Sequence, residues 1–164
     1  MKAAAIVLLC SLPLAAFAAD NPDESFFKKA AEAGMAEVQA GHMAQQKGSS
    51  QAVKDFGAMM VKDHTAANNK LMKIAAAKNI ELPKGPGMMN KAKEEKADLK
   101  SGDSFDKDYI KGQIKAHEDT VKLLQNEIDS GKDADAQAFA KEVLPKVKTH
   151  LDKINQIAAS AGVS

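Results

Sequence analysis

Apolar residues recur at intervals of three and four along most of the chain, and no stretch gives a clear strand signal. Ala and Lys are the most frequent residues, and together with Glu, Gln, Leu and Met, all of which favour helices, they make up more than half of the chain. Short breaks rich in Gly and Ser, and one longer break, divide the pattern. It predicts four helices, at about residues 22–47, 51–79, 103–131 and 134–159.

The lengths of the breaks predict how these helices connect. Residues 48–50 and 131–133 are short enough to form tight turns, so each joins two helices into an antiparallel hairpin. Within residues 80–103, the segment 81–87 (ELPKGPG) contains two Pro and two Gly and is expected to be a loop, and 88–99 is expected to form a short charged helix. A connection of this length can cross the whole bundle and leave its flanking helices parallel. We therefore predict an all-α, ferritin-like four-helix bundle whose two hairpins are joined by a long crossover carrying a short helix.

Each predicted helix carries one polar residue in the middle of its inward face, namely Glu37, His64, His117 and His150. Counted from the turns, the depths within each hairpin differ by three or four residues, or roughly 5–6 Å at 1.5 Å per residue. Glu37 can therefore meet His64, and His117 can meet His150. The pattern leaves open whether the two pairs share one layer. His42 lies nearer the first turn and is not counted with them.

These four residues are the candidate metal ligands. Three neutral imidazoles and one carboxylate suit zinc, copper or iron. Asp63 and Glu118 each stand next to a His, from where they are expected to orient a ligating ring.

The competing interpretation is structural. Buried His side chains that hydrogen-bond Glu37 or one another would specify the register of the helices without any metal. The sequence leaves both interpretations open.

The sequence argues against a di-iron oxidase centre of the kind found in ferritin-like bundles. Such a site needs a Glu three residues before a His on two of its helices. Val61 stands at that position before His64, and the other two candidates are preceded by Ile114 and Val147.

Methionine offers a second metal-binding interpretation. Met59–Met60 and Met88–Met89 are adjacent pairs, and thioether sulfur binds Cu(I). Adjacent helical residues point about 100° apart, so both members of a pair cannot face one site. Core packing is the favoured role of these residues.

The N-terminal segment predicts export. Lys2 is followed by an apolar run over residues 3–9 and by the sequence Ala16-Phe17-Ala18, as in a cleaved secretory signal peptide. We expect a signal peptide over residues 1–18 and one bundle domain over 19–164, located in the periplasm or secreted. Cys10, the only Cys, lies in the signal, so the domain depends on packing and not on disulfides.

The charges exclude several function classes. The chain has 23 basic and 22 acidic residues, and every basic residue is Lys. Balanced charge without Arg argues against nucleic-acid binding.

The sequence after residue 18 contains no stretch apolar enough to span a membrane. It also shows no phosphate-binding loop or hydrolase triad, so we assign no catalytic residues.

Several segments together resemble a known bacterial family, namely FFKKAAEAGMAEVQAGHMAQQKGSS, VKDFGAMMVKDHTAANNKL, KGQIKAHEDTVKLL and LPKVKTHLDKI. The family consists of secreted ferritin-like four-helix proteins of unknown function, often labelled outer membrane proteins. The resemblance implies a four-helix bundle in the periplasm or envelope with a role in envelope stress. It supplies no established reaction.

The sequence therefore favours a non-catalytic envelope protein that binds a metal ion through core His and Glu residues. The alternative is a metal-free structural or protein-interaction module, and a redox enzyme is the third interpretation. The sequence names no protein partner, and it leaves open a homo-oligomer.

Overall fold

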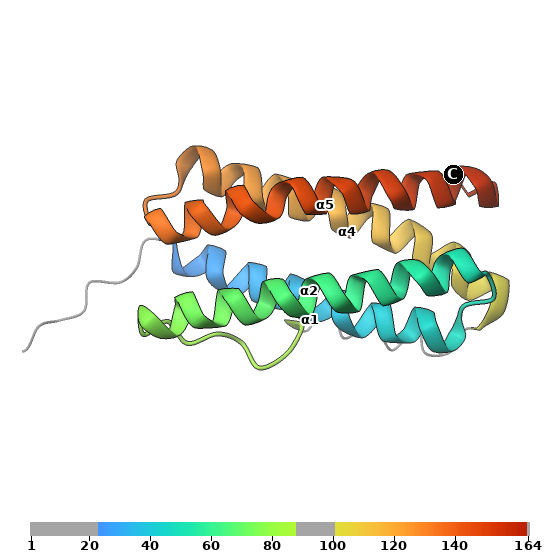
Figure 1. The fold of residues 1–164 in the computed structure, drawn as a ribbon, viewed down its shortest axis with the longest axis horizontal. Helices are drawn as coiled ribbons and strands as arrows, with labels where there is room; N and C mark the ends of the chain where they lie inside the picture. Colours follow the sequence, from blue (N-terminus) through green and yellow to red (C-terminus); the bar gives the residue numbers. More distant parts are fainter. Residues whose placement is uncertain (1–22, 88–100, 164) are drawn as a thin grey trace, which may run out of the picture.

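The described part of the computed structural model, residues 23–87 and 101–163, is helical throughout its regular structure. The helices pack side by side as a four-helix bundle (Figure 1). Their bounds differ from the predicted ones by one or two residues; they are α1 (Glu24–Lys47), α2 (Gln51–Ala77), α4 (Gly102–Ser130) and α5 (Ala134–Ala161).

The connectivity agrees with two hairpins and a crossover. The ribbon shows α1 and α2 as one antiparallel pair and α4 and α5 as the other, with α2 and α4 running in the same direction (Figure 1). Ala77, at the end of α2, and Gly102, at the start of α4, therefore lie toward opposite ends of the bundle, as the predicted crossover requires. The short helix that the sequence predicts at residues 88–99 lies outside the described residues.

Hydrogen bonds at the two ends of the bundle hold the hairpins in register. Asp106, near the start of α4, accepts from the backbone N–H groups of Ser49 and Ser50, at 3.0 and 2.8 Å. At the opposite end, Asp23 accepts from the N–H groups of Lys132 and Asp133 in the second turn. The turn of each hairpin is thus hydrogen-bonded to the other hairpin, and these bonds fix the relative offset of the two hairpins.

Small residues bring α1 and α2 into close contact. A Cβ atom built on Gly57 would lie 2.6 Å from the carbonyl oxygen of Gly41 and 2.7 Å from the Cβ of Ala44. Only residues without larger side chains allow the two backbones to approach this closely.

The core consists of two apolar clusters with a polar layer at their boundary. The first contains Phe27, Leu71, Leu124 and Val147, and the second contains Phe56, Met60, Ile110 and Ile154, among other residues. Helices α2, α4 and α5 each pass from one cluster to the other, and each has a buried His between them. These residues are His64, His117 and His150, with exposed fractions of 7%, 1% and 2%.

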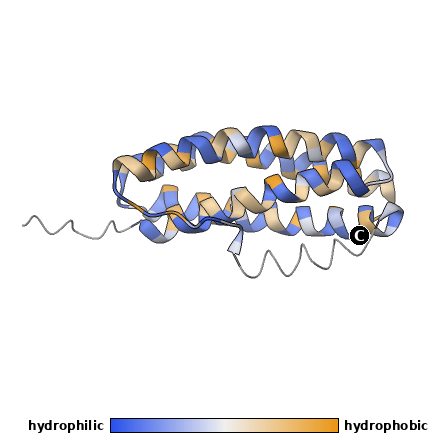
Figure 2. Cartoon of the chain, turned by 90° about the horizontal axis from the view of Figure 1, so that it is seen from below, coloured by the Kyte–Doolittle hydropathy of each residue, from blue (hydrophilic) through white to orange (hydrophobic). Residues whose placement is uncertain are grey.

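Apolar and polar residues alternate around each helix, as Figure 2 shows along the length of the bundle. This amphipathic pattern is what packing against one shared core requires. Within the described residues, no helix combines the length and apolar character that crossing a membrane would need.

Candidate metal centre

Three histidine rings from three different helices meet in the polar layer. The ring centroids of His64, His117 and His150 lie 5.9, 5.5 and 5.6 Å apart in the three pairs. One ring nitrogen of each His lies within 4.8 Å of one ring nitrogen of the other two. This group is called the histidine cluster below.

Hydrogen bonds to other residues orient two of the three rings. His117 Nδ1 lies 2.9 Å from the carbonyl oxygen of Gln113, four residues earlier on α4. His150 Nε2 lies 3.0 Å from Oδ2 of Asp63 on α2. Carbonyl and carboxylate oxygens only accept, so both of these ring nitrogens carry the proton and donate. In the neutral rings, His117 Nε2 and His150 Nδ1 then keep their lone pairs.

One ring nitrogen of each of the three His residues is buried without a protein partner. Among the described residues, His64 Nε2, His117 Nε2 and His150 Nδ1 are buried and accept no hydrogen bond. Buried polar atoms are nearly always satisfied in folded proteins, so three such atoms in one layer need an explanation.

The environment keeps two of these imidazoles neutral. Burial, followed by the nearby His117 and His150, lowers the pKa of His64 to about 3. Burial also lowers the pKa of His150, and the hydrogen bond to Asp63 opposes this effect without outweighing it. A metal ion binds the neutral form of imidazole, so these rings need not lose a proton before binding.

Asp63 is the ionised group beside the cluster. Burial raises its pKa, but the hydrogen bond from His150 and the charge of Lys146 together outweigh burial and lower it. The Nζ of Lys146 lies 3.4 Å from Asp63 Oδ1. Asp63 therefore accepts a hydrogen bond from His150 on Oδ2 and forms an ion pair with Lys146 through Oδ1.

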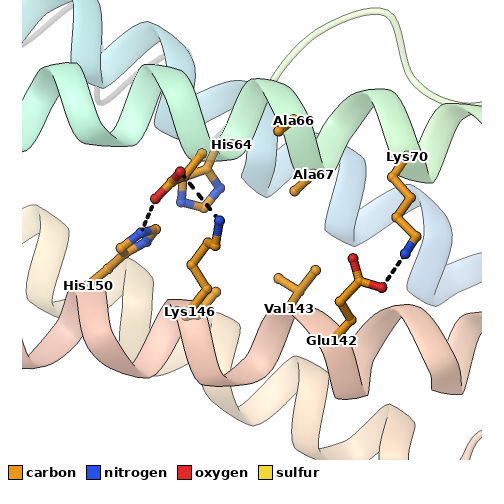
Figure 3. Close-up of a pocket in the computed structure, with 10 residues that line it drawn as sticks. His64, Ala66, Ala67, Lys70, Glu142, Val143, Lys146 and His150 are labelled. Carbon is orange, nitrogen blue, oxygen red and sulfur yellow. Dashed lines mark hydrogen bonds and ion pairs between the residues drawn. The ribbon is translucent and has the colours of Figure 1, made fainter.

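A cavity of about 120 Å³ lies between α2 and α5 and reaches the cluster (Figure 3). His64 and His150 line it, whereas His117 does not. Toward one end, an ion pair between Lys70 and Glu142 joins α2 to α5, and both of these side chains are exposed. The remaining lining residues are Asp63, Ala66, Ala67, Val143, Lys146 and Val147.

The structure places the other predicted site residues outside the histidine cluster. Glu37 is buried on α1, between the parts of that helix that belong to the two apolar clusters. Its charge, after burial, helps to raise the pKa of Tyr109 well above the usual value. Glu118 is exposed on α4, and its charge acts on Lys115. Asp63 contacts His150 across the helices, although the sequence places it beside His64.

Sequence reasoning missed two contributors to the site. The Gln113 carbonyl is a backbone group, so the residue type at this position does not reveal it. The available signal was its position four residues before a buried His, from where a helical carbonyl can accept a hydrogen bond from the ring. Lys146 stands four residues before His150 on the same side of α5, and this spacing was the available signal. Of the methionines that the sequence singled out, Met60 is buried in the core and Met59 is partly buried against it, whereas Met88 and Met89 lie outside the described residues.

The cluster has the donors and nearly the spacing of a metal site. Zinc–imidazole bonds of 2.0–2.1 Å in tetrahedral geometry put ligand nitrogens about 3.3 Å apart. The present separations, at most 4.8 Å, would have to shrink by up to about 1.5 Å, which small side-chain rotations can supply. Hydrogen bonds from the far ring nitrogen to a carboxylate or carbonyl are typical behind ligating histidines.

Similar solved structures support the fold. A protein from Streptomyces coelicolor, described as a "putative secreted protein DUF305", aligns with a TM-score of 0.76 at 10% identity. The alignment covers 88% of this chain and 95% of that one. A conserved hypothetical protein from Mycobacterium tuberculosis aligns with a TM-score of 0.64 at 14% identity, over 84% and 90% of the two chains. Likeness at these identities establishes the four-helix fold alone.

A search of the curated proteins finds no match to this chain. The family comparison does give one, described as "Domain of unknown function (DUF4142)", over residues 11–157. The match begins inside the predicted targeting segment and covers most of the sequence. The chain therefore belongs to the DUF4142 family.

Proposed function

We propose that this protein binds one transition-metal ion, zinc or copper, through His64, His117 and His150. The observation that carries the proposal is the meeting of three buried His rings in one layer, each with one ring nitrogen that has no protein partner. Three neutral nitrogen donors suit Zn²⁺ and Cu²⁺. The cluster suits iron less well, because it contains no carboxylate ligand.

The surrounding contacts favour binding over simple packing. Asp63 and the Gln113 carbonyl fix the proton of two rings on one nitrogen, so the lone pair of the other nitrogen is available. A purely structural cluster would be expected to pair its rings with one another by hydrogen bonds, which the described contacts do not include. Glu37 lies at a similar level but outside the cluster, so we propose that it is not a ligand.

We further propose that the ion is bound outside the cytoplasm. The N-terminal segment has the features of a cleaved signal peptide, and a structural neighbour carries the description of a secreted protein. A role in envelope stress rests on the family resemblance and is part of this proposal.

Elemental analysis of protein exported by its own signal and purified without chelator tests the proposal. We expect about one equivalent of zinc or copper per chain. His64→Ala and His150→Ala should lose the metal while circular dichroism shows the helices retained. His42→Ala is the matched control, because His42 is exposed and stands apart from the cluster.

Two results would overturn the proposal. One is a wild-type protein that takes up no metal at micromolar zinc, copper or iron, which would leave the metal-free interaction module as the better account. The other is full metal content in the His64 and His150 variants. Glu37→Gln adds a separate check, since a loss of metal in this variant would restore Glu37 as a ligand.

A further inference from the structure

The cavity between α2 and α5 lies on one side of the histidine cluster. His64 and His150 form part of its wall, whereas His117 stands behind them and is 1% exposed. Protein atoms therefore surround the cluster on the α4 side, and open space adjoins it on the side of α2 and α5. Figure 3 shows both rings beside this space.

We propose that a metal ion held by the cluster keeps one coordination position toward this cavity and binds a small anion there. This inference rests on the proposed metal site. The cluster supplies three donors, and a zinc ion with three protein ligands completes its tetrahedron with a water molecule or an exogenous ligand. The cavity adjoins His64 and His150, so such a ligand can approach the ion from there.

The charges around the site favour an anion as that ligand. The three imidazoles are neutral when they bind, so a divalent ion contributes two positive charges. Asp63 offsets one of these, and Lys146 adds another, since its ammonium lines the cavity and contacts Asp63. The sum is two net positive charges beside a partly enclosed space, where electrostatic attraction is stronger than in open water.

The size of the cavity limits the ligand. A volume of about 120 Å³ holds several water molecules, each of which occupies about 30 Å³ in the liquid. Hydroxide, halide, azide, formate or bicarbonate would fit, whereas a nucleotide would not. The Lys70–Glu142 ion pair between α2 and α5 further narrows the approach from that side.

Azide titration of the copper-loaded full-length protein tests this inference. Azide bound directly to Cu²⁺ produces a charge-transfer absorption band that unliganded copper lacks. We expect a band that saturates with one azide per bound copper. Lys146→Met, which removes one charge near the ligand, should weaken azide affinity by about three- to tenfold, measured per bound copper.

Lys148→Met is the matched control, because Lys148 is exposed on α5 and does not line the cavity. Its azide affinity should equal that of the wild type. Stoichiometric copper without an azide band would overturn this inference and leave the metal site standing. Failure to take up copper or zinc at all would overturn both proposals. Equal weakening by Lys146→Met and Lys148→Met would refute a specific role for the cavity.

Discussion

Replacing Asp63 by Asn isolates the contribution of the carboxylate behind His150. Asn has nearly the same shape, and its amide oxygen can still accept from His150 Nε2, now 3.0 Å from Asp63. The substitution therefore removes one negative charge and leaves the ring supported. His150 becomes a weaker donor to the metal, and a positive centre loses a nearby counter-charge.

The magnitude follows from the geometry. A metal on the far side of the His150 ring would lie about 6–7 Å from the carboxylate, where each unit of its charge interacts with the carboxylate by about 2–3 kcal/mol at an effective dielectric constant of 20, or about 5 kcal/mol for a divalent ion. Lys146 contacts the same carboxylate and offsets part of this attraction. We expect a net loss of about 1.4–2.7 kcal/mol, which is a ten- to hundredfold weaker metal affinity.

Competition with a chromophoric chelator measures this affinity for zinc, and circular dichroism checks that the helices are retained. Asp152→Asn is the control, since Asp152 is exposed on α5 and its loss changes the net charge equally. Zinc affinity within twofold of the wild type in Asp63→Asn would refute the reasoning. An equal loss in both variants would show a general charge effect and not a positioning of His150.

Three further predictions concern stability. Burial and then the charge of Asp23 raise the pKa of Glu127 to about 7 from its usual 4.5. The folded chain therefore holds a proton that the unfolded chain releases, and stability should fall on the order of 2–3 kcal/mol as pH rises from about 4.5 to 7. Glu127→Gln should flatten this dependence in urea unfolding at pH 5 and 8, and an unchanged slope would contradict it. Gly57→Ala should cost about 1–3 kcal/mol, because the new Cβ would lie 2.6 Å from the Gly41 carbonyl. At Gly112 a new Cβ meets nothing within 4 Å, so Gly112→Ala should instead raise the free energy of unfolding by about 0.5–1 kcal/mol. Thermal or chemical unfolding of the two variants measures both changes. Zinc at a hundredfold excess over its Kd should add about 2.7 kcal/mol, seen as a raised Tm that His64→Ala abolishes; an equal rise in this variant would place the zinc elsewhere.

The helices and their inward faces could be predicted because periodicity reports them directly. A spacing of three and four places Phe56, Met60 and His64 on one side of α2, and all three are buried. Counting residues from the turns also predicted depth, since every helical residue adds a fixed rise. This count is why His117 and His150 were expected to meet, and their rings lie 5.6 Å apart.

The relative position of the hairpins could not be predicted in this way. It depends on contacts such as Asp106 with the first turn and Asp23 with the second, which join residues far apart in sequence. Such pairs leave no periodic signal. The same limit applies to Glu37, whose depth was predictable but whose direction around the helix axis depends on packing. Its charge acts on Tyr109 of α4, and it is absent from the histidine cluster.

X-ray absorption spectroscopy of the zinc-loaded protein tests the central claim most directly. The account predicts three imidazole nitrogens at 2.0–2.1 Å from the zinc, with the outer-shell scattering that imidazole rings produce. His64→Ala should reduce the number of imidazole ligands or abolish binding. A zinc ion surrounded only by oxygen, or by sulfur at about 2.3 Å, would contradict the assignment of His64, His117 and His150 as its ligands.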